Sequence, residues 1–306
     1  MIRVSSYAQN QLLQTNMGTT QAKVSDRTVQ IASGKVTQQY TNISSQALEL
    51  ASLQRSNVRT EQFEKNIQTT KTRLEIMDSN MSTIASRITN LLSDVANGLN
   101  GSNIEEIPFE QFAISFRQEL TALMNAQHEG RYLFAGSLTD TPPVDVTDAA
   151  YTPQAGLPGT FTADFDYYQG DNVTLSNRID QDATLSYGIT ADAPAFEQLL
   201  RSLAYVEYAG ANDDKTVLQE AYNTLQTSLD GVSDFRSQIG AQLSVLEGSE
   251  KKHADFKTYV QNTISGIEDI DVAEATSRLA FDQVQLQASY ISLTRINEIT
   301  LLNYLR

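Results

Sequence analysis

The acidic middle of the chain is the first place where residue types could support chemistry. Between positions 140 and 215 the sequence holds thirteen Asp and Glu residues and three basic ones, a local net charge of −10. Carboxylates are preferred ligands of Ca²⁺, but this segment has no D-x-[DN]-x-[DN]-G loop, and Asp213–Asp214 stands alone. We therefore predict a solvated acidic surface and no metal site.

The two histidines are the candidates for proton transfer near neutral pH. His128 lies in "NAQHEGRYLFAG" with no Ser or Asp constellation beside it, which is typical of a turn or a helix end. His253 follows two lysines inside a helical pattern, so we predict that it lies on the surface. The sequence predicts no catalytic residue.

Two glycine-containing stretches could be mistaken for phosphate-binding loops. "SGK" at 33–35 lacks the G-x-x-x-x-G-K-[ST] spacing, and "GRYLFAGS" at 130–137 lacks G-x-G-x-x-G. We read the second stretch as the exit of a helix into a strand. No cofactor is predicted.

Composition excludes several further classes of function. The chain has 306 residues, no cysteine and no tryptophan, so disulfides and thiolate metal sites are excluded. The net charge of −15 disfavours nucleic acid and anionic membrane as partners. There is no apolar run of eighteen residues and no N-terminal signal-peptide pattern. We expect no membrane insertion, and either a cytoplasmic protein or export by a route that reads no cleaved signal.

Proline placement indicates how these elements are arranged. All six prolines lie between Pro108 and Pro194, and both flanks have none. Because proline breaks helix interiors, we predict two helical arms around an irregular or β-rich insert. Strand and turn residues in "GTFTADFDYYQGDNVTLSNRI" support this, with a turn at Gly170–Asn172. The predicted fold is mainly α, a long antiparallel coiled-coil-like rod from the two arms with a small β-rich outer domain.

Apolar heptads identify the arms as long amphipathic helices. One repeat is Ile67, Leu74, Met81, Ile88 and Val95, with Met77, Ile84 and Leu91 three residues after the middle members; Thr70 and Gly98 are its weak positions. A shorter stripe ends before Ser33-Gly34-Lys35, where glycine predicts a helix terminus, and comprises Leu13, Met17, Thr20, Val24 and Ile31.

The C-terminal flank is predicted as three helices, over 195–208, 214–264 and about 271–305, with Asp269 as a candidate cap of the last. That last helix has two apolar stripes. One runs through Val272, Leu279, Leu286, Tyr290 and Leu293, and the other runs through Ala273, Ala280, Val284, Ala288, Ile291 and Leu302. The N-terminal stripe can cover only one of them. Because an isolated helix is marginal in water, we predict an intermolecular partner for the second stripe.

The termini resemble those of bacterial flagellins and their hook–filament junction relatives. The resemblance rests on "QIASGKV" at 30–36 and on "IEDIDVAEATSRLAFDQVQLQASYISLTRINEITLLNYLR" at 267–306. "GRYLFAGSLTDTPPV" at 130–144 and "YYQGDN" at 167–172 are more similar to the hook-associated protein 3 family than to flagellin. The resemblance covers over two thirds of the chain.

This resemblance implies a structural adaptor, not an enzyme, at the junction between hook and filament. It implies unfolded export through the flagellar type III apparatus, and terminal helices that are disordered in the monomer and fold on assembly. The implied partners are flagellin, hook-associated protein 1 on the hook side, other copies of this chain in a ring, and an export chaperone on the C-terminal segment. We expect assembly contacts from Leu13, Met17, Val24, Ile31, Leu279, Phe281, Leu286, Tyr290, Ile291, Leu293, Ile296, Leu301, Leu302 and Leu305.

The expected division has three parts. Residues 1–45 with 268–306 form terminal assembly helices, residues 46–137 with 195–267 form a helical rod, and residues 138–194 form an outward β-rich insert. The sequence leaves three alternatives: a true flagellin that polymerises, a sugar-binding or enzymatic insert on a flagellin-like scaffold, and a secreted coiled-coil effector. The family-like termini argue against the last.

Overall fold

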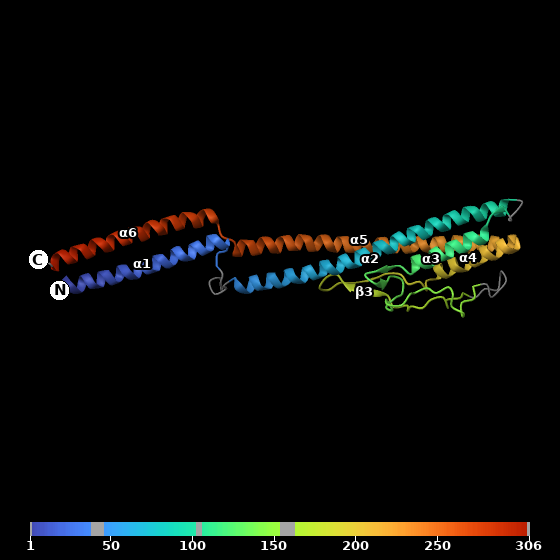
Figure 1. The fold of residues 1–306 in the computed structure, drawn as a ribbon, viewed down its shortest axis with the longest axis horizontal. Coiled ribbons are helices and arrows are strands. Elements are labelled where there is room, and N and C mark those ends of the chain that lie inside the picture. The colour runs from blue at the N-terminus through green and yellow to red at the C-terminus, as the bar shows by residue number, and fades with distance from the viewer. Residues whose placement is uncertain (1, 38–45, 102–105, 154–162, 305–306) are drawn as a thin grey trace. The chain divides into compact units, whose positions relative to one another are not determined.

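The computed structural model describes residues 2–37, 46–101, 106–153 and 163–304, with the side chains of 8–37 and of α6 up to Arg295. The described chain is mainly helical, as predicted (Figure 1). Its helices are α1 (Ile2–Ser33), α2 (Ala47–Asn100), α3 (Phe109–Met124), α4 (Pro194–Asn212), α5 (Lys215–Glu268) and α6 (Val272–Tyr304). Two short hairpins complete it, β1 (Gln127–His128) with β2 (Arg131–Tyr132), and β3 (Leu175–Arg178) with β4 (Thr184–Tyr187).

The fold separates into two compact units. Unit 1 comprises Met1–Arg59 and Asp255–Arg306, and unit 2 comprises Thr60–Ala254. Helices α2 and α5 contribute residues to both. In each unit an early helix packs on a late one.

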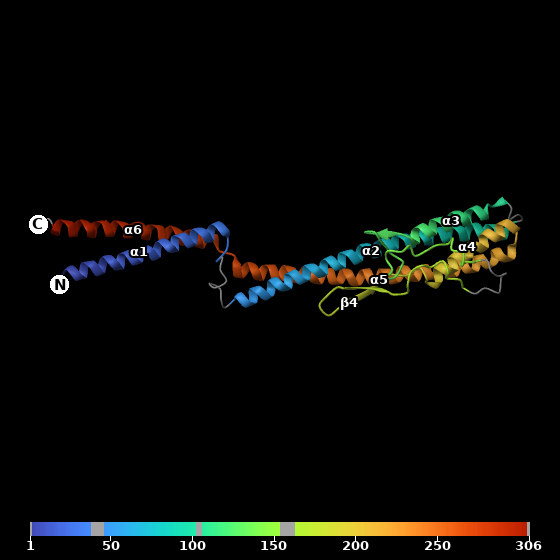
Figure 2. The ribbon, with the colours of Figure 1, turned by 60° about the horizontal axis from the view of Figure 1, so that its bottom comes forward.

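In unit 1, α1 and α6 lie side by side in both views (Figures 1 and 2). They run antiparallel. Arg27 of α1 bonds Asp282 of α6, whereas Lys35, just after α1, forms an antiparallel backbone bridge with Asp269, just before α6. As predicted, α1 ends at Ser33, and Gly34 adopts the left-handed backbone (φ +71°) that glycine tolerates. The cap of α6 is Asp271 rather than the predicted Asp269. Its Oδ1 accepts the backbone N–H groups of Ala273 and Glu274 at 2.9 and 3.0 Å.

In unit 2, α2 packs antiparallel on α5. The ion pairs Lys71–Glu250 (3.3 Å) and Asp78–Arg236 (3.1 Å) fix the direction, because partner numbers fall along α5 as they rise along α2. The heptad prediction is confirmed: all eight apolar members from Ile67 to Val95 are buried, and so is Thr70. Helices α3 and α4 pack on each other, joined by Arg117–Glu207 at 2.7 Å.

The surface placement of His253 is wrong. This side chain is 4% exposed, stacks on Phe63 with ring centroids 5.6 Å apart, and places Nε2 2.7 Å from the carbonyl oxygen of Ile179. The reason is a seven-residue repeat in α5, through Ile239, Leu246, His253, Val260 and Ile267, all buried. Position in that repeat, rather than the flanking lysines, decides which side of the helix the imidazole occupies.

The insert has less strand than its alternating sequence suggests. Only Leu175–Arg178 of the described part of "GTFTADFDYYQGDNVTLSNRI" is a strand, paired with β4 from Leu175↔Tyr187 to Arg178↔Thr184. The hairpin is tied to α2, since Asn177 Nδ2 donates to Thr70 Oγ1 at 2.9 Å and Asn66 Nδ2 to the Arg178 carbonyl at 3.0 Å. His128 lies at a two-residue turn with positive φ at Glu129 and Gly130, as the sequence predicted.

Gly98 provides a test of the α2 packing. A Cβ on Gly98 would lie 2.6 Å from Cζ of the buried Phe109 ring, whereas a Cβ on exposed Gly240 of α5 would meet nothing within 4 Å. We expect Gly98→Ala to lower the free energy of unfolding by about 1–3 kcal/mol through overpacking. Gly240→Ala, the matched control, should raise it by about 0.5–1 kcal/mol. Urea denaturation followed by circular dichroism measures both, and a stabilised Gly98→Ala would contradict the packing.

Candidate assembly surface

Helix α6 has one apolar face that the described residues of unit 1 leave exposed. Phe281 is 69% exposed, Val284 64% and Ile291 55%, and these residues follow one another at helical spacing. Val272 and Tyr290, which the sequence predicted in the same stripe as Leu279, Leu286 and Leu293, are exposed instead of packed on α1. We call Phe281, Val284 and Ile291 the outer stripe. Exposed apolar side chains are ordinary singly, but a contiguous stripe on a helix is typical of an interaction surface.

The opposite face of α6 packs against α1 and forms a thin seam. Leu279, Leu286 and Leu293 are half-buried there, opposite half-buried side chains of α1 that comprise Leu13, Met17, Val24 and Ile31. Among the described side chains of α1 and α6, the only apolar one that is fully buried is Ala275. In unit 2, by contrast, the large apolar side chains at seam positions of α2 are almost completely buried. The α1–α6 pair is therefore weakly packed for its length.

The predicted contact residues divide into two sets. Seven of them, the four on α1 and Leu279, Leu286 and Leu293, lie in the seam. Phe281, Tyr290 and Ile291 are exposed. The side chains of Ile296, Leu301 and Leu302 lie outside the described side chains, and Leu305 lies outside the described residues. Val284 belongs to the predicted second stripe but is not among the predicted contact residues. Leu12 and Val29 of α1 are exposed and are not among them either.

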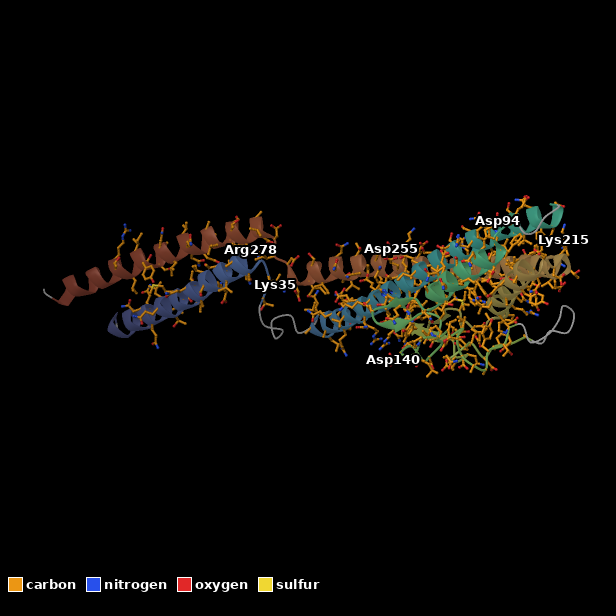
Figure 3. All side chains as sticks on the ribbon, turned by 45° about the vertical axis from the view of Figure 1, so that its right-hand side comes forward. Lys35, Asp94, Asp140, Lys215, Asp255 and Arg278 are labelled. Atoms are coloured by element: carbon orange, nitrogen blue, oxygen red, sulfur yellow. The ribbon has the colours of Figure 1, made fainter. Side chains whose placement is uncertain are left out.

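The two family-like terminal motifs meet at the base of the α1–α6 pair. Backbone hydrogen bonds join Val36 N–H to the Glu268 carbonyl (2.8 Å) and Ile270 N–H to the Gly34 carbonyl (3.0 Å). Lys35 Nζ lies 2.6 Å from Glu268 Oε2, and Gln54 of α2 donates to Oε1 of the same carboxylate at 3.2 Å. Lys35 and Arg278, both labelled in Figure 3, stand near this end of the pair. The motifs thus form one bonded junction, which we call the elbow. It joins residues 34–36, residues 268–270 and Gln54 of α2.

The two motifs of the insert are also bonded to each other. Asp171 accepts the backbone N–H of Ser137 at 2.7 Å and the Ser137 hydroxyl, and its own N–H donates to the Ala135 carbonyl at 3.2 Å. The Tyr168 hydroxyl donates to the Asp171 carbonyl at 2.6 Å. Gly136 has φ +69°, and a Cβ there would lie 2.2 Å from the Asp171 carbonyl oxygen. The stretches "GRYLFAGS" and "YYQGD" therefore join the start of the insert to its middle.

The electrostatics of the insert follow from these bonds. The hydrogen bonds from Ser137 lower the pKa of Asp171 below its usual value, because they stabilise the ionised carboxylate. Burial raises the pKa of Glu197, and the neighbouring Arg201 guanidinium, 3.0 Å away, opposes that rise. Burial also raises the pKa of Tyr151 and Tyr167, so both phenols stay neutral. The Tyr167 hydroxyl donates to the Ala191 carbonyl at 2.8 Å. These groups hold the insert together.

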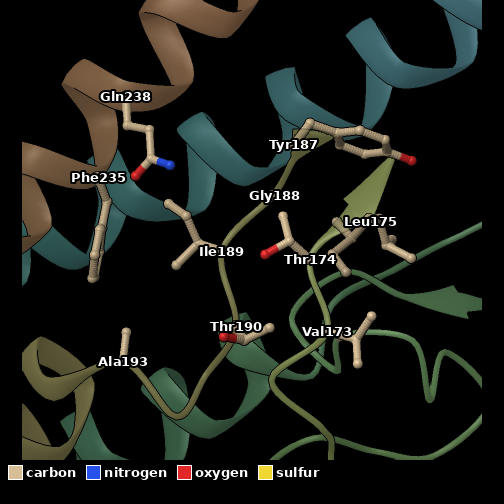
Figure 4. A pocket seen from close by; sticks show the side chains of 12 residues that line it. Val173, Thr174, Leu175, Tyr187, Gly188, Ile189, Thr190, Ala193, Phe235 and Gln238 are labelled. Atoms are coloured by element: carbon tan, nitrogen blue, oxygen red, sulfur yellow. The ribbon is translucent and has the colours of Figure 1, made fainter. Parts of the chain in front are cut away.

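A pocket of about 190 Å³ lies between the β3–β4 hairpin and α5 (Figure 4). Thr174, Ile189 and Thr190 come from the hairpin side, while Phe235 and Gln238 come from the helix. None of the described residues that line it is charged.

Within the described part of the chain, no helix is long and apolar enough to cross a bilayer. The same described residues hold no cluster of three or more His, Asp or Glu side chains arranged to bind a metal ion.

Comparison with known sequences finds relatives of flagellar proteins. Residues 223–305 match the bacterial flagellin C-terminal helical region. The chain is 26% identical over 199 residues to flagellar hook-associated protein 3 of Salmonella typhimurium, an alignment that covers 60% of this chain and 62% of that protein. It is 23% identical over 258 residues to flagellar hook-associated protein 3 of Escherichia coli, covering 75% and 76% respectively. The alignment thus spans less than two thirds of the Salmonella relative.

A solved structure supports the same fold. Bacillus cereus FlgL superimposes with a TM-score of 0.56 at 16% identity, covering 70% of this chain and 99% of that chain. The flagellin-like character inferred from the terminal motifs is confirmed. Both sequence relatives named above are flagellar hook-associated protein 3.

The hydrogen bonds that Asp171 accepts should make stability depend on pH. Because the folded pKa of Asp171 is lowered, its contribution is present above the unfolded pKa and is lost as pH falls through the folded value. We expect Asp171→Asn to lower the midpoint of thermal unfolding at pH 7, and the difference from wild type to shrink as pH falls from 4 toward 2. Asp140→Asn, an exposed carboxylate of the same insert, is the control. An equal difference at pH 7 and pH 2 would contradict a role for the ionised carboxylate.

Proposed function

We propose that this flagellin-like chain is a structural adaptor at the hook–filament junction of the bacterial flagellum and that it performs no catalysis. The observation that carries the proposal is the outer stripe of α6, an apolar surface that the described part of its own chain leaves exposed. It lies within the region that matches flagellins. The names of the two sequence relatives, both flagellar hook-associated protein 3, point to the junction.

The mechanism that we propose is coupled folding and binding of α1 and α6. Ordering a residue costs roughly 1–2 kcal/mol of backbone entropy, and the thin seam returns little of it because its apolar side chains are only half-buried. Covering the exposed parts of Phe281, Val284 and Ile291 would add roughly 3–5 kcal/mol per chain. Contact with neighbouring subunits would therefore stabilise helices that are marginal in the monomer.

The partners follow from the same surface. We propose that the outer stripe, together with the more C-terminal predicted residues of α6, meets other copies of this chain in a ring, hook-associated protein 1 on one side and flagellin on the other. Before export an apolar helix face needs a cover, which supports a chaperone that binds the C-terminal segment. The described residues of the acidic, hydrogen-bonded insert show no comparable apolar stripe, which supports our proposal that it faces outward.

We retain the three-part division as a functional one. Terminal assembly helices over 1–45 and 268–306 would form the junction, residues 46–137 with 195–267 would be the rod, and 138–194 the outward insert. Glu268, at the elbow, is where the first two parts meet in the described chain. Localisation at the junction, outside the cell, is part of the proposal.

Two observations would favour an alternative function over the junction adaptor. Growth of long filaments from seeded, concentrated protein would indicate a flagellin. Loss of a binding activity on deletion of 138–194, with filament attachment intact, would indicate a ligand-binding insert.

The outer stripe can be tested without disturbing the seam. We expect Phe281→Ser with Ile291→Ser to lower the fraction of hooks that carry filaments at least about tenfold, since each lost apolar contact weakens every subunit interface. Secreted flagellin should rise accordingly. Electron microscopy of cells that express only the variant measures the fraction, and export of the variant is followed by immunoblot.

The matched control is Val245→Ser, which removes a comparably exposed apolar side chain from α5. It should leave filament number unchanged. Normal filaments in the Phe281/Ile291 variant would refute the assembly role of this face.

Coupled folding predicts uneven amide exchange in the dilute monomer. We expect exchange within seconds for residues 2–32 of α1 and 272–304 of α6, because few buried contacts hold them. Residues 67–95 of α2, whose apolar seam is buried, should be protected for at least hours. Mass spectrometry of the full chain resolves the segments, and strong protection of both α1 and α6 in the monomer would contradict the mechanism.

A further inference from the structure

Where its side chains are described, the α1–α6 seam contains one charged pair at positions that a coiled coil normally gives to apolar residues. Arg27 Nε lies 2.9 Å from Asp282 Oδ2, and the two side chains are 26% and 11% exposed. All other charged residues of α1 and α6 whose side chains are described are exposed: Lys23, Asp26, Glu274, Arg278 and Arg295. Val24 of α1 and Leu279 and Leu286 of α6 flank the pair in the seam.

The apolar residues alone do not define how the two helices align. Leu279, Leu286 and Leu293 are identical and seven residues apart, so sliding α6 by seven residues replaces leucine by leucine against α1. The half-buried partners on α1 also recur near this period. Shape and hydrophobicity therefore favour several alignments almost equally.

The charges distinguish these alignments. In an antiparallel pair, a slip by seven residues would place Asp282 near Thr20 or Gly34, and Arg27 near Ala275 or Ser289. Each slip breaks the pair and places both charges opposite uncharged seam residues, and the largely buried Asp282 carboxylate then loses the counter-ion that faces it. A single polar pair at core positions is a known means by which coiled coils select register at the expense of stability.

We propose that Arg27 and Asp282 are positioning residues that set the register and rotation of α6 on α1. Because the pair holds Asp282 against α1, the outer stripe, which lies on the other side of α6, is kept facing away from α1. The consequence for assembly rests on the proposed function; the register itself does not. The pair acts by excluding alternatives rather than by adding stability.

Engineered cysteines can report the register, because the natural chain contains no cysteine. Val24 lies one turn before Arg27 and Leu286 one turn after Asp282, so Val24→Cys with Leu286→Cys marks the observed register. Val24→Cys with Leu279→Cys, or with Leu293→Cys, marks the two slipped registers. Disulfide yields of the full chain in a glutathione redox buffer report how often each register forms, even when the helices form only transiently.

Four backgrounds separate register from stability. With native Arg27 and Asp282, the observed-register disulfide should exceed the slipped ones at least about tenfold. Arg27→Asp alone should lower the observed-register yield by about tenfold, and Arg27→Asp with Asp282→Arg should restore it to within about threefold. Arg27→Met with Asp282→Leu should keep total cross-linking high but reduce the preference to below about threefold.

Two outcomes would overturn the proposal: failure of the charge swap to restore the preference, or an undiminished preference in the Met/Leu variant. Filament assembly is scored separately in cells. A swap that restores the register but not filaments would leave the positioning role intact and count against the proposed function of the outer stripe.

Discussion

The antiparallel packing of α2 on α5 along a seven-residue repeat is the contact on which the rest of unit 2 depends. It buries the apolar residues from Ile67 to Val95, and the repeat that includes Leu246 and His253 faces it from α5. The β3–β4 hairpin is hydrogen-bonded to α2 at Asn66 and Thr70. Without the helix pair, four-residue strands would have no surface to lie on, since an isolated hairpin is at best marginally stable in water.

Unit 1 repeats the same geometry with different side chains. On α6, leucine occupies only every second position of the seam, and Ala275, Asp282 and Ser289 occupy the others. Smaller and polar residues bury less area, so the free energy gained per turn is lower. A low-stability helix pair with an apolar outer face suits a segment that must be covered by partners, whereas the tightly packed unit 2 suits a scaffold.

The insert is held by hydrogen bonds rather than by extended sheet. Asp145, Asp164 and Asp171 each accept a backbone N–H nearby in the loops, and Glu197 pairs with Arg201. An insert with nine acidic residues and one basic residue between 138 and 194, a net charge of −8, can fold this way because its carboxylates satisfy backbone donors that strands would otherwise pair. The acidity therefore has a structural use, and it keeps this part of the surface polar.

The sequence by itself determined the long helices, the end of α1 at Gly34, the buried heptad of α2 and the two apolar faces of α6, because each is a local pattern of period near 3.6 residues or a glycine effect. It could not place His253 or identify Asp271 as the cap. Only the tertiary structure decided which stripe of α6 faces α1 and which is exposed, and that Arg27 meets Asp282. Those outcomes depend on a partner more than two hundred residues away, and periodicity carries no information about which of two apolar faces a distant helix will cover.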